Sequence, residues 1–198
     1  MVVLRRNFIK CVVIGDDDVG KTSMLVSYAT NRFPRKHVQP VFDNYAANLS
    51  IDGRQCHLQL IDTLEQDTHL DCRKHIFLGT DIFVVCFSCV KPDSFKNVEK
   101  KYVPEIRQQM GEDVPFILVS TQTDLREDCS VLHELRRSGS EPISTAEGTK
   151  MARRLGAACY VECFPDLEKK VKRVINKAIL SVICPKDSSV DVQGCTIL

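Results

Sequence analysis

The chain has 198 residues, of which 43% are hydrophobic and 27% are charged, and its 27 Lys and Arg against 26 Asp and Glu give a formal net charge of +1. A chain of this length can bury the core of one full domain, and this ordinary composition excludes collagen-like, low-complexity and disordered classes. Nucleic-acid-binding proteins usually carry a marked basic excess, so the charge balance predicts no nucleic-acid partner.

Two features of the sequence predict a soluble, intracellular protein. The longest uncharged apolar stretch, Ile82 to Val90, has nine residues, about half of what a membrane-spanning helix needs. The ten cysteines lie mostly in apolar runs, where a free thiol behaves as a small hydrophobic side chain. Because no secretory signal is recognisable, free structural thiols are favoured over a disulfide framework.

Apolar, β-branched runs alternate with amphipathic stretches, which predicts an α/β fold with a mainly parallel sheet. Asp52 and Gly53 lie between two such runs and are typical of a tight hairpin turn. Ser144 and Glu147 predict a capping box, and Gly111 is a natural C-cap. These elements fit a doubly wound sheet of six strands with about five helices. The predicted strands are 8–14, 45–51, 55–61, 82–88, 116–120 and 160–163, and predicted helices include 20–29, 93–111, 144–155 and 166–182.

Residues 15–22 carry the motif with the most chemical content. They have the sequence G-D-D-D-V-G-K-T, which satisfies the pattern G-x-x-x-x-G-K-[ST], and they lie between the first predicted strand and the first predicted helix. The backbone N–H groups of such a loop and the positive end of the following helix bind phosphates. Lys21 is expected to reach the β- and γ-phosphates, and the Thr22 hydroxyl to hold Mg²⁺, unless the loop only resembles this motif.

Four further segments make the chain similar to the Rho family of Ras-like small GTPases: Phe33-Pro34, Val41–Tyr45, Asp62-Thr63 and Thr121–Arg126. The resemblance extends from Ile9 to Cys184 and includes a charged segment at 127–138, where Rho proteins carry an extra insert helix. Thr121-Gln122 and the segment 156–160 resemble the branch that contains RhoQ and RhoJ. The resemblance implies a P-loop small-GTPase fold for residues 1–183, followed by a tail at 184–198.

The resemblance also implies a guanine-nucleotide switch that binds GTP or GDP with Mg²⁺. In that role Asp124 accepts hydrogen bonds from the guanine base, and Phe33 lies against the base edge. Asp62 supports the Mg²⁺ ion beside Thr22, and Gln66 positions the attacking water. The residues that the resemblance places at the nucleotide are Gly15, Asp16, Asp17, Asp18, Val19, Gly20, Lys21, Thr22, Ser23, Phe33, Thr121, Gln122, Asp124 and Cys163. Those that it places in an effector loop, for Rho-type effectors and regulators, are Val41, Phe42, Asp43 and Tyr45.

Several departures from the family pattern lie where the γ-phosphate would be. Asp17 replaces a family glycine and Asp18 adds a second carboxylate, while two unit charges about 4 Å apart interact by about 4 kcal/mol at an effective dielectric of about 20. Pro40 replaces the threonine that binds Mg²⁺, and it lacks both a hydroxyl and an N–H. Glu65 replaces the glycine that lets the backbone approach the γ-phosphate closely. We therefore expect GTP hydrolysis to suffer more than GTP binding.

A further departure lies at the base. Phe164 and Pro165 replace a family Ser-Ala pair whose backbone N–H binds the guanine O6, and proline cannot donate a hydrogen bond. A missing hydrogen bond to a buried acceptor costs about 1–3 kcal/mol. Together the departures predict an atypical GTP-binding protein whose turnover is weak or absent. The alternative is a pseudo-GTPase scaffold that binds effectors or regulators with little or no nucleotide.

The residues Cys195 to Leu198 form a CaaX box, and the terminal leucine is typical of geranylgeranylation of Cys195. One lipid gives only marginal membrane binding, and a second signal is normally needed. Lys186 is the only basic residue between Cys184 and Cys195, so the usual basic stretch is missing, and a palmitoyl group on Cys184 is the alternative. We expect weak attachment to the cytoplasmic face of the plasma membrane or of endomembranes.

Overall fold

The computed structural model describes residues 7–31, 44–51, 54–63, 70–164 and 168–184. In these residues a six-stranded sheet has the order β2-β3-β1-β4-β5-β6, and all neighbouring strands are parallel except the antiparallel pair β2 and β3. The strands are β1 (Phe8–Ile14), β2 (Asn44–Ile51), β3 (Arg54–Asp62), β4 (Ile82–Ser88), β5 (Phe116–Thr121) and β6 (Tyr160–Glu162). The helices are α1 (Lys21–Thr30), α2 (Leu70–Phe77), α3 (Pro92–Asn97), α4 (Val103–Met110), α5 (Cys129–Arg137), α6 (Thr145–Leu155) and α7 (Glu168–Ile183).

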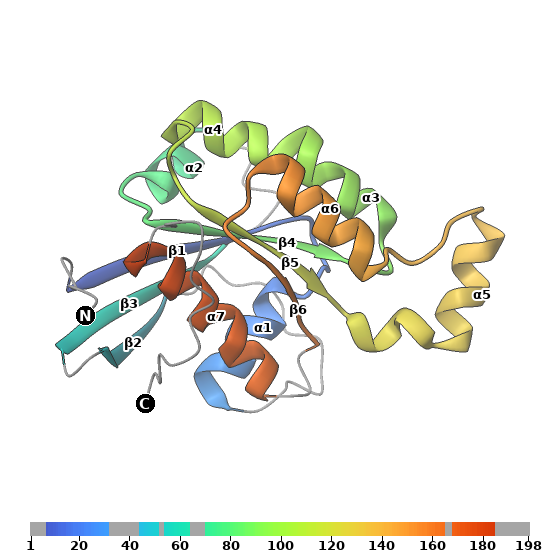
Figure 1. Cartoon of the computed structure of the whole chain (residues 1–198), viewed down its shortest axis with the longest axis horizontal. Coiled ribbons are helices and arrows are strands. Elements are labelled where there is room, and N and C mark those ends of the chain that lie inside the picture. The colour runs from blue at the N-terminus through green and yellow to red at the C-terminus, as the bar shows by residue number, and fades with distance from the viewer. Residues whose placement is uncertain (1–6, 32–43, 52–53, 64–69, 165–167, 185–198) are drawn as a thin grey trace.

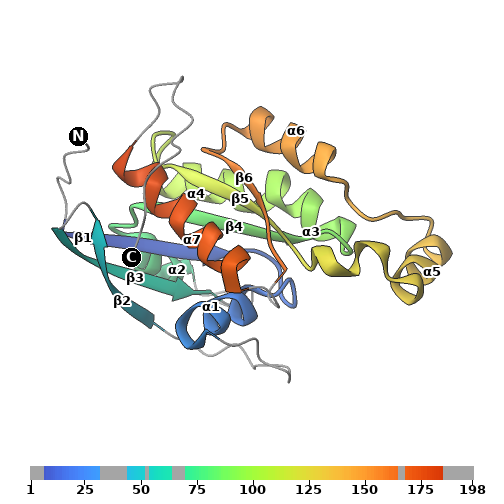
Figure 2. The same ribbon diagram turned by 60° about the horizontal axis from the view of Figure 1, so that its bottom comes forward.

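The sheet buries both of its faces, because successive side chains of a strand point to opposite sides. In β1, Cys11 and Val13 belong to the core shared with α1 and α7, whereas Val12 and Ile14 belong to the core shared with α2, α3, α4 and α6. Figures 1 and 2 show the corresponding two layers of helices, one on each side of the sheet. The described residues thus form the predicted doubly wound α/β fold.

Several predicted elements have the predicted bounds or nearly so. The strands at 8–14 and 82–88 begin and end at the predicted residues. The two strands of the predicted hairpin pair antiparallel. The capping box at the start of α6 is complete, since Glu147 N–H donates to the Ser144 hydroxyl and Ser144 N–H donates to the Glu147 carboxylate. Gly111 follows α4 with φ +87°, a conformation that favours glycine.

Two helical features differ from the prediction. The sequence pattern predicts no helix at 70–77, where α2 forms. The helix predicted at 93–111 begins at Pro92 and is interrupted by a π-turn (Val98–Tyr102), in which Val103 N–H donates to the Val98 carbonyl. Pro104 explains the wider turn, because proline has no N–H and its ring collides with the carbonyl four residues earlier in a regular α-helix.

The segment at 127–138 contains α5, whose N-terminus is capped by Asp128. The Asp128 carboxylate accepts hydrogen bonds from the N–H groups of Ser130 (2.9 Å) and Val131 (3.1 Å). Figures 1 and 2 show α5 standing away from the sheet, beyond the end of β5. A short 3-10 turn (Thr123–Glu127) joins it to β5.

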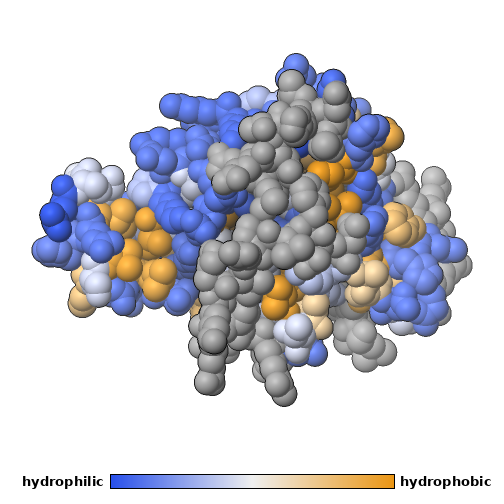
Figure 3. Space-filling model, turned by 180° about the vertical axis from the view of Figure 1, so that it is seen from behind, coloured by the Kyte–Doolittle hydropathy of each residue, from blue (hydrophilic) through white to orange (hydrophobic). Residues whose placement is uncertain are grey.

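Figure 3 shows one face of the molecule in a space-filling view. Seen from behind, hydrophilic residues dominate the described part of this face, and the apolar ones form small separate groups. Among the helices of the described ranges, none combines the length and the apolar character that crossing a bilayer requires.

Candidate functional site

One edge of the sheet gathers the residues that the motifs single out. Because β1, β3, β4, β5 and β6 run parallel, their carboxyl ends lie at the same edge. The loop 15–20 leaves β1 there, while Asp62 ends β3 and Thr121 ends β5. Ligands of doubly wound sheets bind in the crevice outside this edge, so it is the candidate site.

Two glycines shape the loop between β1 and α1. A Cβ on Gly15 would lie 2.2 Å from the carbonyl oxygen of Cys86 in β4, so only glycine lets the chain leave β1 this close to its neighbour. Gly20 has φ +90° and is the N-cap of α1. Since Gly20 has no side chain, it leaves the first N–H groups of the helix to an anion. Val19 is fully buried and anchors the loop in the core.

Lys21, the first residue of α1, lies inside the curve of this loop. It is 5% exposed, and its Nζ donates to the carbonyl oxygens of Gly15 (2.8 Å) and Asp16 (2.7 Å). The hydroxyl of Thr22, the next residue, donates to the Asp62 carboxylate, and both side chains are buried. A buried ammonium group beside a hydroxyl and a carboxylate fits a phosphate chain with Mg²⁺, which prefers oxygen ligands. Ser23 follows in the first turn of α1 and is half-buried.

The acidic residues of the loop have different surroundings. Asp18 has φ +57° and an exposed side chain, and its Oδ2 lies 4.0 Å from Lys91 Nζ. Asp17 is half-buried in the loop. The Asp16 side chain reaches the π-turn that follows α3. Of the two carboxylates expected to oppose the γ-phosphate, Asp18 is therefore the more exposed to solvent, and it also lies near a lysine.

Thr121 and Gln122 tie the carboxyl end of β5 to the phosphate loop. The Thr121 hydroxyl lies within hydrogen-bonding distance of the carbonyls of Val19 (2.5 Å) and Phe87 (2.9 Å). The Gln122 amide nitrogen donates to the Asp18 carbonyl (3.2 Å), and the Gln122 amide oxygen accepts from the Ser88 hydroxyl (2.5 Å). Gln122 has a left-handed backbone conformation, and the following 3-10 turn holds Asp124 exposed at the same edge.

An ion pair joins this turn to β6. Arg126 Nη2 lies 2.7 Å from Glu162 Oε1, and Arg126 Nε donates to the Ile143 carbonyl at 3.1 Å. The same Glu162 oxygen accepts from the hydroxyls of Thr145 (2.8 Å) and Tyr160 (3.0 Å). Partial burial acts to raise the pKa of Glu162, but these hydrogen bonds outweigh it and lower the pKa below the ordinary glutamate value. This network holds together the turn that contains Asp124 and the end of β6 at Cys163, the two segments that the sequence analysis places at the guanine base.

Glu162→Gln should therefore destabilise the protein at neutral pH. We expect a loss of about 2 kcal/mol in unfolding free energy, the range for hydrogen bonds to a charged group. Because the pKa of Glu162 is lowered, its contribution is present above the ordinary glutamate pKa of about 4.3 and is lost as the pH falls further. Urea unfolding of wild type and variant at neutral pH and below pH 4 measures both effects.

The matched control is Glu99→Gln. Glu99 pairs with Arg154 at 2.7 Å, but both side chains are about half exposed, so its loss should cost less than about 0.5 kcal/mol. Equal losses in the two variants would contradict the bracing role of Glu162.

The two residues that follow β6, Cys163 and Phe164, both contact other parts of the protein. Cys163 is buried, its N–H donates to the Ser120 carbonyl (2.8 Å), and burial raises the pKa of its thiol to about 12. The next residue, Phe164, is covered by Lys170, whose Nζ lies 3.6 Å from the ring centroid. This cation–π contact fixes the aromatic side chain that the sequence places at the base.

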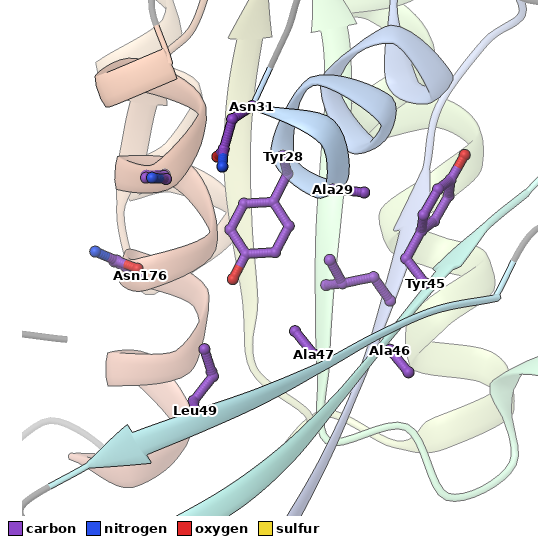
Figure 4. Close-up of a pocket in the computed structure, with 10 residues that line it drawn as sticks. Tyr28, Ala29, Asn31, Tyr45, Ala46, Ala47, Leu49 and Asn176 are labelled. Atoms are coloured by element: carbon purple, nitrogen blue, oxygen red, sulfur yellow. The ribbon is translucent and has the colours of Figure 1, made fainter. Parts of the chain in front are cut away.

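Tyr45 lies on β2, an edge strand of the sheet, and lines a cavity of about 530 Å³. Figure 4 shows Tyr28 of α1, Asn31 directly after α1 and Asn176 of α7 on the other walls of this cavity. The predicted residues Phe33, Val41, Phe42, Asp43, Gln66 and Cys195 lie outside the described residues, as do the departures Pro40, Glu65 and Pro165.

The motifs did not single out Ser88 or Glu162, and they did not assign Arg126 a role. Arg126 follows Asp124 by two residues and Glu162 immediately precedes Cys163. A basic residue close to Asp124 and an acidic residue beside Cys163 are the signal in the sequence that would have identified this ion pair.

The geometry of this edge agrees with a comparison of the whole sequence. Residues 10–184 match the model of the Ras family, and Ras-like GTPases bind GTP or GDP and typically Mg²⁺. The match covers the loop 15–22, Asp62, the Thr121–Arg126 segment and Glu162, which the fold brings to one edge of the sheet. The chain therefore belongs to the Ras family of small GTPases and has a GTP-binding role.

Proposed function

We propose that this protein is a Rho-type GTP-binding protein of membrane or cytoskeletal signalling that holds guanine nucleotide and hydrolyses GTP weakly or not at all. The observation that carries the proposal is the buried Lys21 ammonium group inside a loop that also contains Asp17 and Asp18. This arrangement supports nucleotide binding, and the two acidic residues of the same loop support impaired hydrolysis.

The residues of this edge would divide the binding work as follows. Lys21 and the first N–H groups of α1 would offset the phosphate charge. Thr22 and Asp62 would hold Mg²⁺, which supplies further positive charge to the phosphates when it is bound. Asp124 would accept from the guanine base, in a turn that Gln122 and Arg126 hold in place.

Weak hydrolysis follows from residues that oppose the γ-phosphate or no longer contact it. Asp17 brings a negative charge toward the position where charge spreads over the γ-phosphate oxygens during transfer. Pro40 and Glu65 remove a hydroxyl and a close backbone approach, as the sequence predicts. Gln66 would then position water in a site that lacks its other groups.

Membership of the Rho branch is supported by the Thr121-Gln122 pair and by the helix α5 within the segment 127–138. Partner binding is supported by Tyr45 on the edge strand β2, next to the cavity between α1, β2 and α7. Attachment to the cytoplasmic face of the plasma membrane or of endomembranes would depend on a geranylgeranyl group on Cys195.

A second candidate is a pseudo-GTPase scaffold with little or no nucleotide. The observation that favours it lies at the base: Lys170 covers the Phe164 ring, and the Cys163 N–H donates to Ser120. The Phe164 ring and the Cys163 N–H therefore both have partners within the protein and are not directed at a guanine oxygen.

The nucleotide carried by the purified protein separates these functions. The protein is denatured after purification with Mg²⁺, and the released nucleotide is identified by chromatography. We expect GTP at close to one per chain. GDP at that ratio would contradict impaired hydrolysis, and no nucleotide, with no thermal shift on adding GTP or GDP, would favour the scaffold.

Asp17→Gly should raise GTP affinity by about tenfold without restoring turnover. Removing one unit charge close to the phosphates is worth about 1–2 kcal/mol at an intermediate dielectric, while Pro40 and Glu65 still impair hydrolysis. Titration with a fluorescent GTP analogue and a phosphate-release assay measure the two quantities.

The control for this substitution is Asp18→Asn. The Asp18 carboxylate is exposed and lies near Lys91, so its removal should change affinity less than about threefold because solvent and salt screen it. If Asp17→Gly alone restored multiple turnovers, the interpretation of Pro40 and Glu65 would be wrong.

A further inference from the structure

The carboxylate of Asp16 is held by side chains from another part of the chain. The Tyr102 hydroxyl donates to Oδ1 at 2.6 Å, and the Asn97 amide nitrogen donates to Oδ2 at 2.8 Å. Tyr102 is fully buried, and Asp16 and Asn97 are half-buried. Each oxygen of the partly shielded carboxylate therefore has a neutral hydrogen-bond donor. We call these three side chains the Asp16 clasp.

The π-turn is what brings both donors to one carboxylate. Asn97 and Tyr102 are five positions apart, and residues five apart in a regular α-helix are separated by about 140° around the axis. A π-turn instead closes on the residue five positions away, as the hydrogen bond from Val103 N–H to the Val98 carbonyl does here. The turn that accommodates Pro104 thus places Asn97 and Tyr102 on the side that faces the phosphate loop.

We propose that Asn97 and Tyr102 are positioning residues for the phosphate loop, an inference that rests on the nucleotide binding proposed above. The clasp fixes the Asp16 side chain against the helix and keeps its charge from turning toward bound phosphates. The Asp16 carbonyl remains directed at Lys21 Nζ (2.7 Å). One residue thus supplies a carbonyl to the binding cation while its carboxylate is held elsewhere.

This arrangement matters more in this chain than in a loop with fewer acids. Asp16 is followed directly by Asp17 and Asp18, and repulsion between carboxylates and phosphates grows with each charge that faces the ligand. Releasing Asp16 should therefore weaken binding, and the loss should be larger for GTP than for GDP because GTP carries one more phosphate.

Three variants of the full chain test the inference by titration with fluorescent GTP and GDP analogues. In Asn97→Ala/Tyr102→Phe the clasp is lost, and we expect about a tenfold loss of affinity for the GTP analogue and a smaller loss for the GDP analogue. Adding Asp16→Ala to this double variant removes the released charge and should restore most of the affinity. Gln108→Ala, an exposed side-chain amide on α4, is the control and should leave affinity unchanged.

The triple variant decides between positioning and simple packing. If Asp16→Ala fails to restore GTP affinity, the two donors act only through loop structure and the proposal is overturned. Wild type that binds neither nucleotide would instead contradict the proposed function. The clasp is then judged in nucleotide-free protein by a double-mutant cycle between Asp16→Ala and Tyr102→Phe. A coupling of about tenfold in the unfolding equilibrium constant is expected, and a coupling below twofold would overturn the clasp.

Discussion

Lys21→Ala is expected to lower the affinity for GTP and GDP by about 100-fold or more. The Lys21 ammonium group is 5% exposed and donates to two carbonyls of the loop, so it is fixed where phosphates would enter. A hydrogen bond to a charged partner contributes about 1.5–3 kcal/mol, and about 2.7 kcal/mol corresponds to 100-fold in affinity. With the cation removed, the helix N-terminus and Mg²⁺ would have to offset the repulsion between the loop carboxylates and the phosphates without the lysine.

The experiment compares bound nucleotide after purification and equilibrium titration, with circular dichroism to show that the variant is folded. Lys10→Ala is the matched control, because Lys10 Nζ also donates to a backbone carbonyl, that of Leu78 at 2.8 Å. It lies near the opposite end of β1, and its loss should change affinity less than twofold. A folded Lys21→Ala protein with wild-type affinity would contradict the proposed phosphate site.

Gly15→Ala should be among the most destabilising single substitutions in the described core. The added Cβ would lie 2.2 Å from the Cys86 carbonyl oxygen, and the residue has φ +152°. The obstacle is backbone in the middle of the sheet, so relief requires β1 and β4 to separate. Overpacking of this kind costs about 3 kcal/mol or more, which urea unfolding of the nucleotide-free protein would measure.

Gly79→Ala is the control for backbone conformation alone. Gly79 has φ +72°, but nothing lies within 4 Å of the position of its Cβ. Its replacement should cost about 1–2 kcal/mol, the penalty for a side chain in the left-handed region. If both alanine variants lost the same stability, the contact between Gly15 and Cys86 would not be the cause.

The strands and the phosphate loop could be predicted because local chemistry determines them. The run at 82–88 is almost continuously apolar, as a central parallel strand is, and the run at 8–14 is apolar and β-branched apart from Lys10. Both strands have the predicted bounds. Ser144 and Glu147 specify the start of α6 by direct hydrogen bonds. The loop 15–22 follows from its glycines and its position between a strand and a helix.

The rest depends on contacts between residues far apart in the sequence. α2 (LDCRKHIF) is short and mixes apolar with charged residues, and it is tied to α4 by the Arg73–Glu105 ion pair at 2.8 Å, which no local pattern predicts. Pro104 explains the π-turn that precedes it, but the contact of this turn with Asp16 depends on the fold, which brings residues 16 and 102 together. Arg126 and Glu162 are 36 residues apart in the sequence, so no local pattern predicts that they form a pair.

The links from Thr121 to Val19 and from Gln122 to Asp18 have a consequence for the energetics of association. They join the phosphate end and the base end of the edge within the protein itself, through two side chains and two backbone carbonyls. The conformational entropy of aligning these two ends is then lost during folding rather than on encounter with the ligand. A nucleotide meets two preorganised walls at a fixed separation, so its own length, from base to phosphates, becomes part of what the protein selects.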